Sequence, residues 1–271
     1  EVEADWSPDG KKIVFARQPV KGACKRDIFL MSANGVLLKQ LTNHPACDRT
    51  PRWSPDGKSI AFVSYRDGGE DLYLMTPNGD NLRKVTNDAQ VSFLNWSPDG
   101  KQLVFTSKKD ELPQIHVINV DGTGLKNLSQ SRTTKDWYPV YSPDGKEIAF
   151  GRAGVVGFAF TLHVMDADGK NQRPFLKDFP QHRVNGGILW LPDGRLLFSG
   201  EFPNVLIGDR VTGVFAVQGE NMKPKLLFNW GIQMDITSWF DPAFARAVQP
   251  EGKWFTTWGQ VKATGLGRDS N

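Results

Sequence analysis

The stretch Trp53-Ser-Pro-Asp-Gly-Lys58 recurs along the chain with small changes. Its proline presets the backbone of a turn, its aspartate tolerates the next turn position, and its glycine adopts a left-handed conformation at little cost. Further copies stand at Trp6–Lys11, Trp96–Lys101, Tyr141–Lys146 and Trp190–Arg195, with a degenerate copy at Pro250–Lys253. The motif prolines stand at positions 8, 55, 98, 143, 192 and 250, so the steps are 47, 43, 45, 49 and 58 residues. Such a period, about 40–50 residues, is typical of one β-propeller blade.

The residues between two motifs read as four strands. In the second repeat we expect short strands at Pro51–Trp53 and Asp71–Met75, and a strand at Ser59–Ser64 that is apolar on both faces. A strand with two apolar faces is expected where a sheet is packed between two neighbours. Asn81–Thr86 is more polar and suits an outer edge.

The repeated W-S-P-D-G-K, followed by an apolar strand, L-Y-L-M-x-x-N/D-G and L-T-N, resembles the TolB-like propellers, which are relatives of the WD-repeat propellers. The resemblance covers nearly the whole chain and implies an all-β propeller of six blades, mostly of four antiparallel strands. We expect one domain, with blades at approximately residues 1–50, 51–93, 94–138, 139–187, 188–240 and 241–271. The last blade departs from the repeat, so we expect it to be irregular, incomplete, or completed by a strand from another segment or chain.

Composition excludes several classes of function. The chain has 271 residues, 39% of them hydrophobic, and a net charge of +3 with both signs mixed throughout. So weak and scattered a charge does not favour nucleic acid or an anionic membrane as partner. No apolar run approaches the roughly 18 residues that span a bilayer. The chain starts at Glu1, not Met, so the missing targeting segment gives no information about compartment.

The two ends of the predicted propeller differ. The P-D-G and N/D-G turns are short and uniform, which indicates a scaffold end. The opposite end carries loops and blade-to-blade links of unequal length, and function on rigid scaffolds usually resides in such loops. We therefore expect a binding site at this variable end, at the mouth of the central channel.

Cys24 and Cys47 both fall on the variable end, where they flank the third and fourth strands of blade one. A disulfide between them would close a loop of about 24 residues and contribute about 3 kcal/mol in the chain-entropy model. Two unpaired thiols in a reducing compartment are the alternative. With the family resemblance, a disulfide implies a bacterial periplasmic or extracellular location.

No strong catalytic or metal motif is present. His116 and His163 align with Phe29 and Tyr73, so we interpret them as packing residues. H-E-x-x-H, C-x-x-C and G-x-S-x-G are absent. Asp166–Gly169 mimics the start of a calcium loop but lacks the terminal glutamate. We expect neither a cofactor nor a metal, and no catalytic residue.

Nine residues of the variable end are candidates for contact with a protein or peptide partner. Aromatic side chains there can anchor a peptide or stack on a sugar, and arginines interleaved with aspartates suit a polar segment. Sealing gaps between blades and mutual neutralisation explain the same residues equally well. The candidates are Arg49, Arg66, Trp137, Tyr138, Arg152, His182, Arg183, Trp230 and Trp239.

Three functions remain open. The leading hypothesis is a non-catalytic module of an exported or envelope-associated bacterial complex, which binds a protein or peptide. A polysaccharide-active enzyme of the lyase type is the first alternative, and it would need Tyr138, His182 and Glu201 to converge on one proton. A lectin that uses Trp137, Trp230 and Trp239 is the second.

Overall fold

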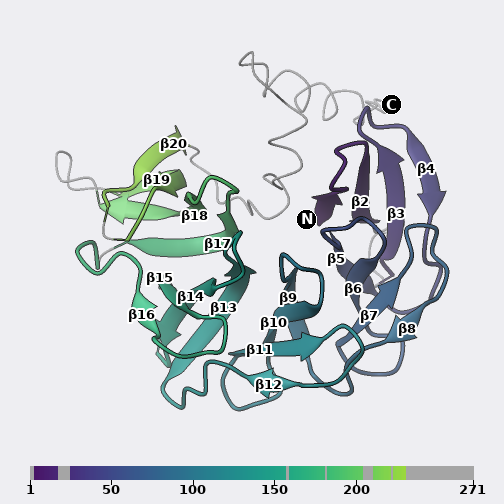
Figure 1. Ribbon diagram of the computed structural model, residues 1–271, viewed down its shortest axis with the longest axis horizontal. Helices are drawn as coiled ribbons and strands as arrows, with labels where there is room; N and C mark the ends of the chain where they lie inside the picture. The colour runs from purple at the N-terminus through teal and green to yellow at the C-terminus, as the bar shows by residue number, and fades with distance from the viewer. Residues whose placement is uncertain are drawn as a thin grey trace, which may run out of the picture.

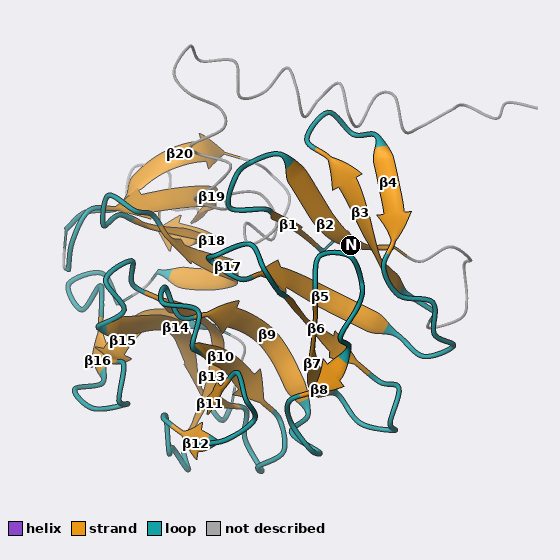
Figure 2. Ribbon diagram, turned by 45° about the vertical axis from the view of Figure 1, so that its right-hand side comes forward, coloured by secondary structure: helices purple, strands orange, loops and turns teal. Residues whose placement is uncertain are grey.

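The computed structural model describes residues 3–17, 25–156, 159–180, 182–203, 210–220 and 222–229. These residues form five antiparallel sheets of four strands, each with its strands in chain order. The sheets follow one another around a common axis, with the first strand of each sheet nearest the axis (Figure 1). Figure 2 shows the same sheets turned by 45° about the vertical axis, joined by loops and turns. Within this part of the chain, no helix is long and apolar enough to cross a membrane.

The strands of the five blades have the following bounds. Blade one has β1 (Ala4–Trp6), β2 (Lys12–Arg17), β3 (Asp27–Ser32) and β4 (Leu37–Gln40). Blade two has β5 (Asp48–Trp53), β6 (Ile60–Ser64), β7 (Asp71–Met75) and β8 (Arg83–Lys84). Blade three has β9 (Val91–Trp96), β10 (Gln102–Ser107), β11 (Gln114–Asn119) and β12 (Lys126–Asn127). Blade four has β13 (Thr134–Tyr141), β14 (Glu147–Gly154), β15 (Thr161–Asp166) and β16 (Arg173–Pro174), and blade five has β17 (Arg183–Trp190), β18 (Leu196–Pro203), β19 (Arg210–Val217) and β20 (Lys225–Asn229).

The expectation of six blades is wrong, because the described residues form five blades of four strands each. Six blades are what the family resemblance implies, and the sequence supports the sixth only by a degenerate motif. Pro250–Lys253 has glutamate in place of aspartate and is preceded by glutamine where four of the other copies have serine. In those four copies this serine and aspartate close the turn, as described next. The predicted sixth blade, residues 241–271, lies outside the described residues.

The P-D-G turn is closed by its own side chains. In blade two, Ser54 Oγ donates to Asp56 Oδ1 (2.7 Å), and the same carboxylate oxygen accepts from the Lys58 backbone N–H (3.0 Å). Gly57 then adopts a φ of 71°, which only glycine reaches cheaply. The serine–aspartate bond recurs at 2.7 Å in blades one, three and four.

The second and third strands supply the core. Every residue of β6 and β7 is buried. One phenylalanine per blade, at the same position of the second strand, is fully buried in blades two to five, at Phe62, Phe105, Phe150 and Phe198. The fourth strands lie outermost, and all four residues of β4 are exposed. Val36, Leu37 and Leu38 therefore form an apolar run on the outer edge of blade one.

Adjacent blades are joined by repeated polar contacts. On the inside, the Trp53 backbone N–H donates to Asp5 Oδ2 (2.7 Å). Along the outside, a basic residue of one fourth strand reaches a turn carbonyl of the next blade. Lys39 Nζ donates to the carbonyl of Asn78 (2.7 Å), and Lys126 Nζ donates to that of Asp168 (2.7 Å).

The second uniform turn touches the preceding blade through glycine. Gly169 has a φ of 92°, and a Cβ atom there would lie 2.8 Å from the carbonyl oxygen of Leu128 in blade three. Gly79 is in the same relation to Leu41, at 2.9 Å. A side chain at either position would force the two blades apart.

We expect Gly169→Ala to destabilise the ring more than Gly68→Ala does. Gly68 has a similar φ of 88°, but no atom lies within 4 Å of the place that a Cβ would take, so its substitution costs only left-handed strain, about 1–2 kcal/mol. Gly169→Ala adds the clash with the Leu128 carbonyl, about 1–3 kcal/mol more. Urea unfolding of both variants measures the difference, and equal unfolding free energies would contradict the close contact between blades.

His116 and His163 are packed side chains of the third strands. Their rings lie 5.9 Å from those of Phe105 and Phe150, centroid to centroid. Burial lowers the pKa of both imidazoles, and the hydrogen bond from each Nδ1 to a backbone carbonyl opposes that shift only in part. The rings are thus held in the neutral form.

We expect His163→Phe to weaken the acid sensitivity of the fold. In the unfolded chain histidine binds a proton near pH 6.5, whereas in the folded protein it does so only at lower pH. The contribution of the neutral ring is therefore present above about pH 6.5 and is lost as pH falls toward the folded pKa. Phenylalanine, found at the matching position 29, removes this loss. Unfolding free energies from pH 7.5 to 5 should fall less steeply in the variant, and identical slopes would refute the argument.

Candidate functional site

Two of the predicted arginines are bound to buried aspartates. Arg66 Nη2 donates to both carboxylate oxygens of Asp48 (3.1 and 3.0 Å), and Arg152 reaches Asp136 through Nε and Nη2 (2.8 Å each). Both aspartates are fully buried and stand five residues before the motif aromatic of their blades. These guanidinium groups hold a buried carboxylate in place, a contact whose loss on one side is costly.

The other two predicted arginines also have acidic neighbours. Arg49 Nη2 lies 2.9 Å from Glu70 Oε1, and Lys108 Nζ lies 2.8 Å from Glu70 Oε2. The Tyr65 hydroxyl donates to the same glutamate. Arg183, which is exposed, lies 3.8 Å from Glu201. The partner-binding role of the four arginines stays a prediction, and the contacts found here are internal to the chain.

His182 is buried and bonded on both ring nitrogens. Its Nε2 accepts the Leu162 backbone N–H (2.8 Å), and its Nδ1 lies 2.5 Å from the carbonyl of Phe179. In the three preceding blades a hydroxyl oxygen accepts the equivalent backbone N–H at the start of the third strand. These hydroxyls belong to Thr42, Thr86 and Ser129. His182 thus takes the structural role that the threonine of the L-T-N motif has in blades one and two. The position of His182 in a predicted loop did not reveal this role.

Trp137 and Tyr138 belong to an aromatic cluster between blades three and four. The Phe93 ring lies 4.4 Å from that of Tyr138 and 5.6 Å from that of Trp137, and Phe160 packs edge-on against both. Phe93 and Tyr138 occupy the same bulge position of the innermost strands and have φ values of 49° and 59°. Both predicted aromatics are half-buried, so they seal an inter-blade gap and still present a face to solvent.

The three candidate acid–base residues each have a contact of their own. Glu201 accepts a hydrogen bond from Asn185 Nδ2 (2.8 Å), Tyr138 belongs to the aromatic cluster, and His182 Nε2 accepts the Leu162 backbone N–H. Their convergence on one proton stays a prediction. Trp230, Trp239 and Cys24 lie outside the described residues. Cys47 is buried, and its disulfide with Cys24 stays a prediction. Among the described residues there is no group of three or more His, Cys, Asp or Glu side chains that could hold a metal ion.

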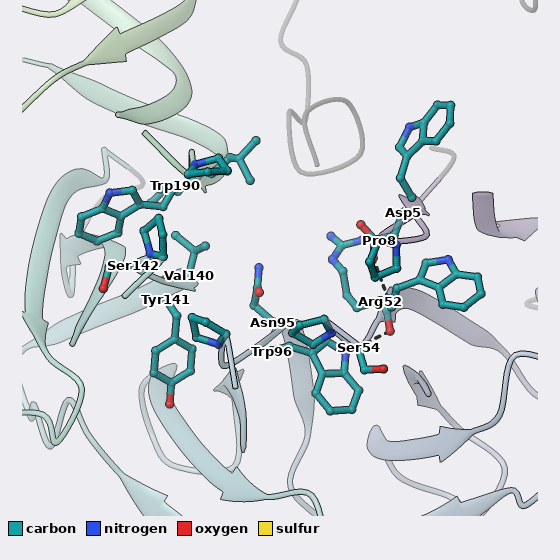
Figure 3. Close-up of a pocket in the computed structure, with 18 residues that line it drawn as sticks. Asp5, Pro8, Arg52, Ser54, Asn95, Trp96, Val140, Tyr141, Ser142 and Trp190 are labelled. Atoms are coloured by element: carbon teal, nitrogen blue, oxygen red, sulfur yellow. Dashed lines mark hydrogen bonds between the residues drawn. The ribbon is translucent and has the colours of Figure 1, made fainter. Parts of the chain in front are cut away.

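A cavity of about 380 Å³ opens at the end of the ring that carries the P-D-G turns (Figure 3). All five blades contribute, because the last residues of each innermost strand and the following turn face the axis. The motif prolines form its rim, at Pro8, Pro55, Pro98, Pro143 and Pro192. This cavity lies opposite the variable end where we expected a site.

The wall of the cavity is polar on one side and apolar on the other. The residue just before the motif aromatic is Asp5, Arg52 or Asn95 in the first three blades. In blades four and five the same position is Val140 or Leu189, and Ile188 adds to that side. In Figure 3 the side chains of Arg52 and Asn95 project into the space between the blades.

Sequence reasoning overlooked Arg52 and Asn95 because they precede a uniform motif at the end interpreted as scaffold. The signal was available: one position of the repeat changes its chemistry from blade to blade while the motif after it stays constant. In a propeller, the residue type at such a position next to the axis can change from blade to blade without disturbing the turn that follows.

Comparison with known proteins places this geometry in a family. A family model, the TolB beta propeller domain, matches residues 2–181. Over 59 residues the chain is 33% identical to the Tol-Pal system protein TolB of Syntrophus aciditrophicus, a match that spans 22% of this chain and 13% of that protein.

Several solved structures are similar in fold. A putative TolB from Agrobacterium tumefaciens has a TM-score of 0.58 and 24% identity over 79% of this chain and 74% of its own. An oligogalacturonate lyase from Vibrio parahaemolyticus has a TM-score of 0.61 and 17% identity over 85% and 67%. At these identities the likeness shows the fold alone. Because the family model matches more than half of the chain, this protein belongs to the TolB beta propeller domain family.

Proposed function

We propose that this chain is a non-catalytic propeller module that binds a protein or peptide in a bacterial envelope complex, in the periplasm. Membership of the TolB propeller family supports the proposal, as does a relative whose name assigns it to the Tol-Pal system. The match covers only a small part of that relative, so its role comes to this chain as an inference.

The observation that carries the proposal is the axial cavity. A ring of sheets joined by fixed turns provides a preformed hollow with a few polar groups on an otherwise apolar wall, as in many binding sites. Preformed hollows bind well because little ordering is required of the protein. The half-buried Trp137 and Tyr138 give the variable end a second surface for the same kind of partner.

The contacts around the candidate acid–base residues also favour binding. A general base needs a nitrogen or oxygen free to take a proton. Both nitrogens of His182 are engaged, because Nε2 accepts the Leu162 backbone N–H and Nδ1 lies 2.5 Å from the Phe179 carbonyl.

Photo-crosslinking tests the binding surface. A photoreactive residue in place of Lys101 or Lys146 sits on the P-D-G turns beside the rim, and one in place of Lys170 is a matched control on an outer turn. The three lysine side chains are 81%, 81% and 78% exposed. In a periplasmic extract of the source bacterium we expect a discrete protein adduct at the first two positions and none at Lys170.

A further probe at Arg183 examines the variable end. An adduct there alone would move the binding surface to that end. Silence at all of these positions would refute the protein-binding function.

The alternative is a polysaccharide lyase, favoured by the shared fold with the oligogalacturonate lyase. We expect incubation of the protein with oligogalacturonate to yield no unsaturated sugar above a protein-free control. Product formation that disappears in Tyr138→Phe would overturn the non-catalytic assignment.

A further inference from the structure

We propose that the axial cavity binds the C-terminal carboxylate of a peptide that ends in an aliphatic residue, with Arg52 as the principal contact. This deepens the proposed function, on which it rests, by naming the chemical group that the cavity recognises.

Arg52 has no carboxylate partner among the described residues. Its one hydrogen bond is from Nη1 to the carbonyl of Pro51, its own neighbour (3.1 Å). By contrast Arg49, Arg66, Arg152 and Arg173 each lie within 3.0 Å of an acidic oxygen. Arg52 is half-buried in the cavity wall, where water replaces a missing partner only in part. A guanidinium has five N–H donors in a fixed fork that matches both oxygens of a carboxylate.

Asn95 stands next to Arg52 around the axis and offers a second donor. It is half-buried, lines the cavity and projects into it (Figure 3). Its side-chain amide makes no hydrogen bond within the described part of the chain, so it is available to a ligand oxygen. Arg52 and Asn95 come from adjacent innermost strands, β5 and β9, which are held in register by the hydrogen bond from Trp96 Nε1 to the Arg52 carbonyl (3.1 Å).

Asp5 is the acidic residue of the cavity wall, and its carboxylate would repel a bound anion. It is buried, and its Oδ2 accepts the Trp53 backbone N–H. It forms no ion pair with Arg52, so the guanidinium keeps its donors. The negative charge of Asp5 should weaken the binding of a carboxylate, and this gives the experiment a variant with the opposite sign.

The opposite wall of the cavity favours an aliphatic side chain on the residue that carries the carboxylate. Val140, Ile188 and Leu189 are buried and present only hydrocarbon to the cavity. An aliphatic side chain placed against them loses its contact with water, which is favourable in proportion to the apolar area covered.

The size and position of the cavity favour a chain end. About 380 Å³ is near the lower limit for ligand pockets, so it takes one or two residues. It lies on the axis, and residues of all five described blades line it. An internal segment needs room for backbone on both sides of the bound residue, whereas a chain end needs it on one side. A C-terminus enters once, and its last residue carries both the carboxylate and the side chain.

Three short peptides test the proposal directly. They are acetyl-Ala-Ala-Leu with a free C-terminal carboxylate, the same peptide as its C-terminal amide, and acetyl-Ala-Glu-Leu-amide. Isothermal titration calorimetry gives affinities, and amide chemical shifts of residues 95 and 189 locate the binding. For the wild type we expect the free acid to bind at least about tenfold more tightly than the amide, because a charge-assisted hydrogen bond is lost in the amide.

Variants assign the effect to Arg52. Arg52→Gln should lower the affinity for the free acid to that for the amide, while Asp5→Asn should raise it several-fold. Arg195→Gln removes the same charge from the same end of the ring but does not line the cavity, so it should change affinity little. Thermal unfolding verifies that each variant folds.

Two results would overturn the proposal. Equal affinity of the wild type for the free acid and the amide would remove the carboxylate as the recognised group. Preference for the internal glutamate peptide would replace the chain end by a side chain. Either result is compatible with protein adducts at Lys101 and Lys146, so this inference can fail while the proposed function stands.

Discussion

The ring depends on turns that bring the backbone of one blade against the next. At Gly169 the absence of a side chain lets the turn approach the Leu128 carbonyl, and at Gly79 the same contact involves Leu41. Basic side chains such as Lys39 and Lys126 then bond to carbonyls of these turns. Each blade is therefore positioned mainly by its predecessor, as expected for a repeat protein whose stability is carried by nearest-neighbour contacts.

This arrangement determines which residues are free for recognition. Charged groups at the variable end are engaged in structure: Asp48 and Asp136 are buried and each is neutralised by an arginine. At the end that carries the P-D-G turns the backbone is more regular. The residue before each motif aromatic faces the axis there, and its side chain takes no part in closing the turn. Arg52 and Val140 occupy matching places in two blades with no change in the motif that follows. Regularity of the scaffold is thus what permits chemical variety at the axis.

Much of the fold could be predicted from the motif because the motif is a physical device. The proline, aspartate and glycine specify a turn at Gly57, and the spacing specifies the blades. The blade count of six rested on the family resemblance, and the sequence itself specified the sixth blade poorly. Pro250–Lys253 keeps the proline and glycine of the motif but not its serine and aspartate.

The candidate site was less accessible to sequence reasoning. Whether an arginine is paired depends on residues far away in sequence, as with Arg66 and Asp48. His182 looked like a loop histidine because its bond to Leu162 spans 20 residues. The family resemblance itself was confirmed by the match over residues 2–181.

The outer edge of blade one has a consequence for how the protein behaves in concentrated solution. The short fourth strands of blades two and three, β8 and β12, carry Arg83, Lys84 and Lys126, and charge on an edge discourages another strand from pairing with it. β4 is twice as long and begins with exposed Leu37 and Leu38, which follow exposed Val36, while its one charged residue, Lys39, is bonded to the Asn78 carbonyl of blade two. We expect self-association, where it occurs, to begin at this strand, so that a lysine placed there would improve solubility without touching the axis.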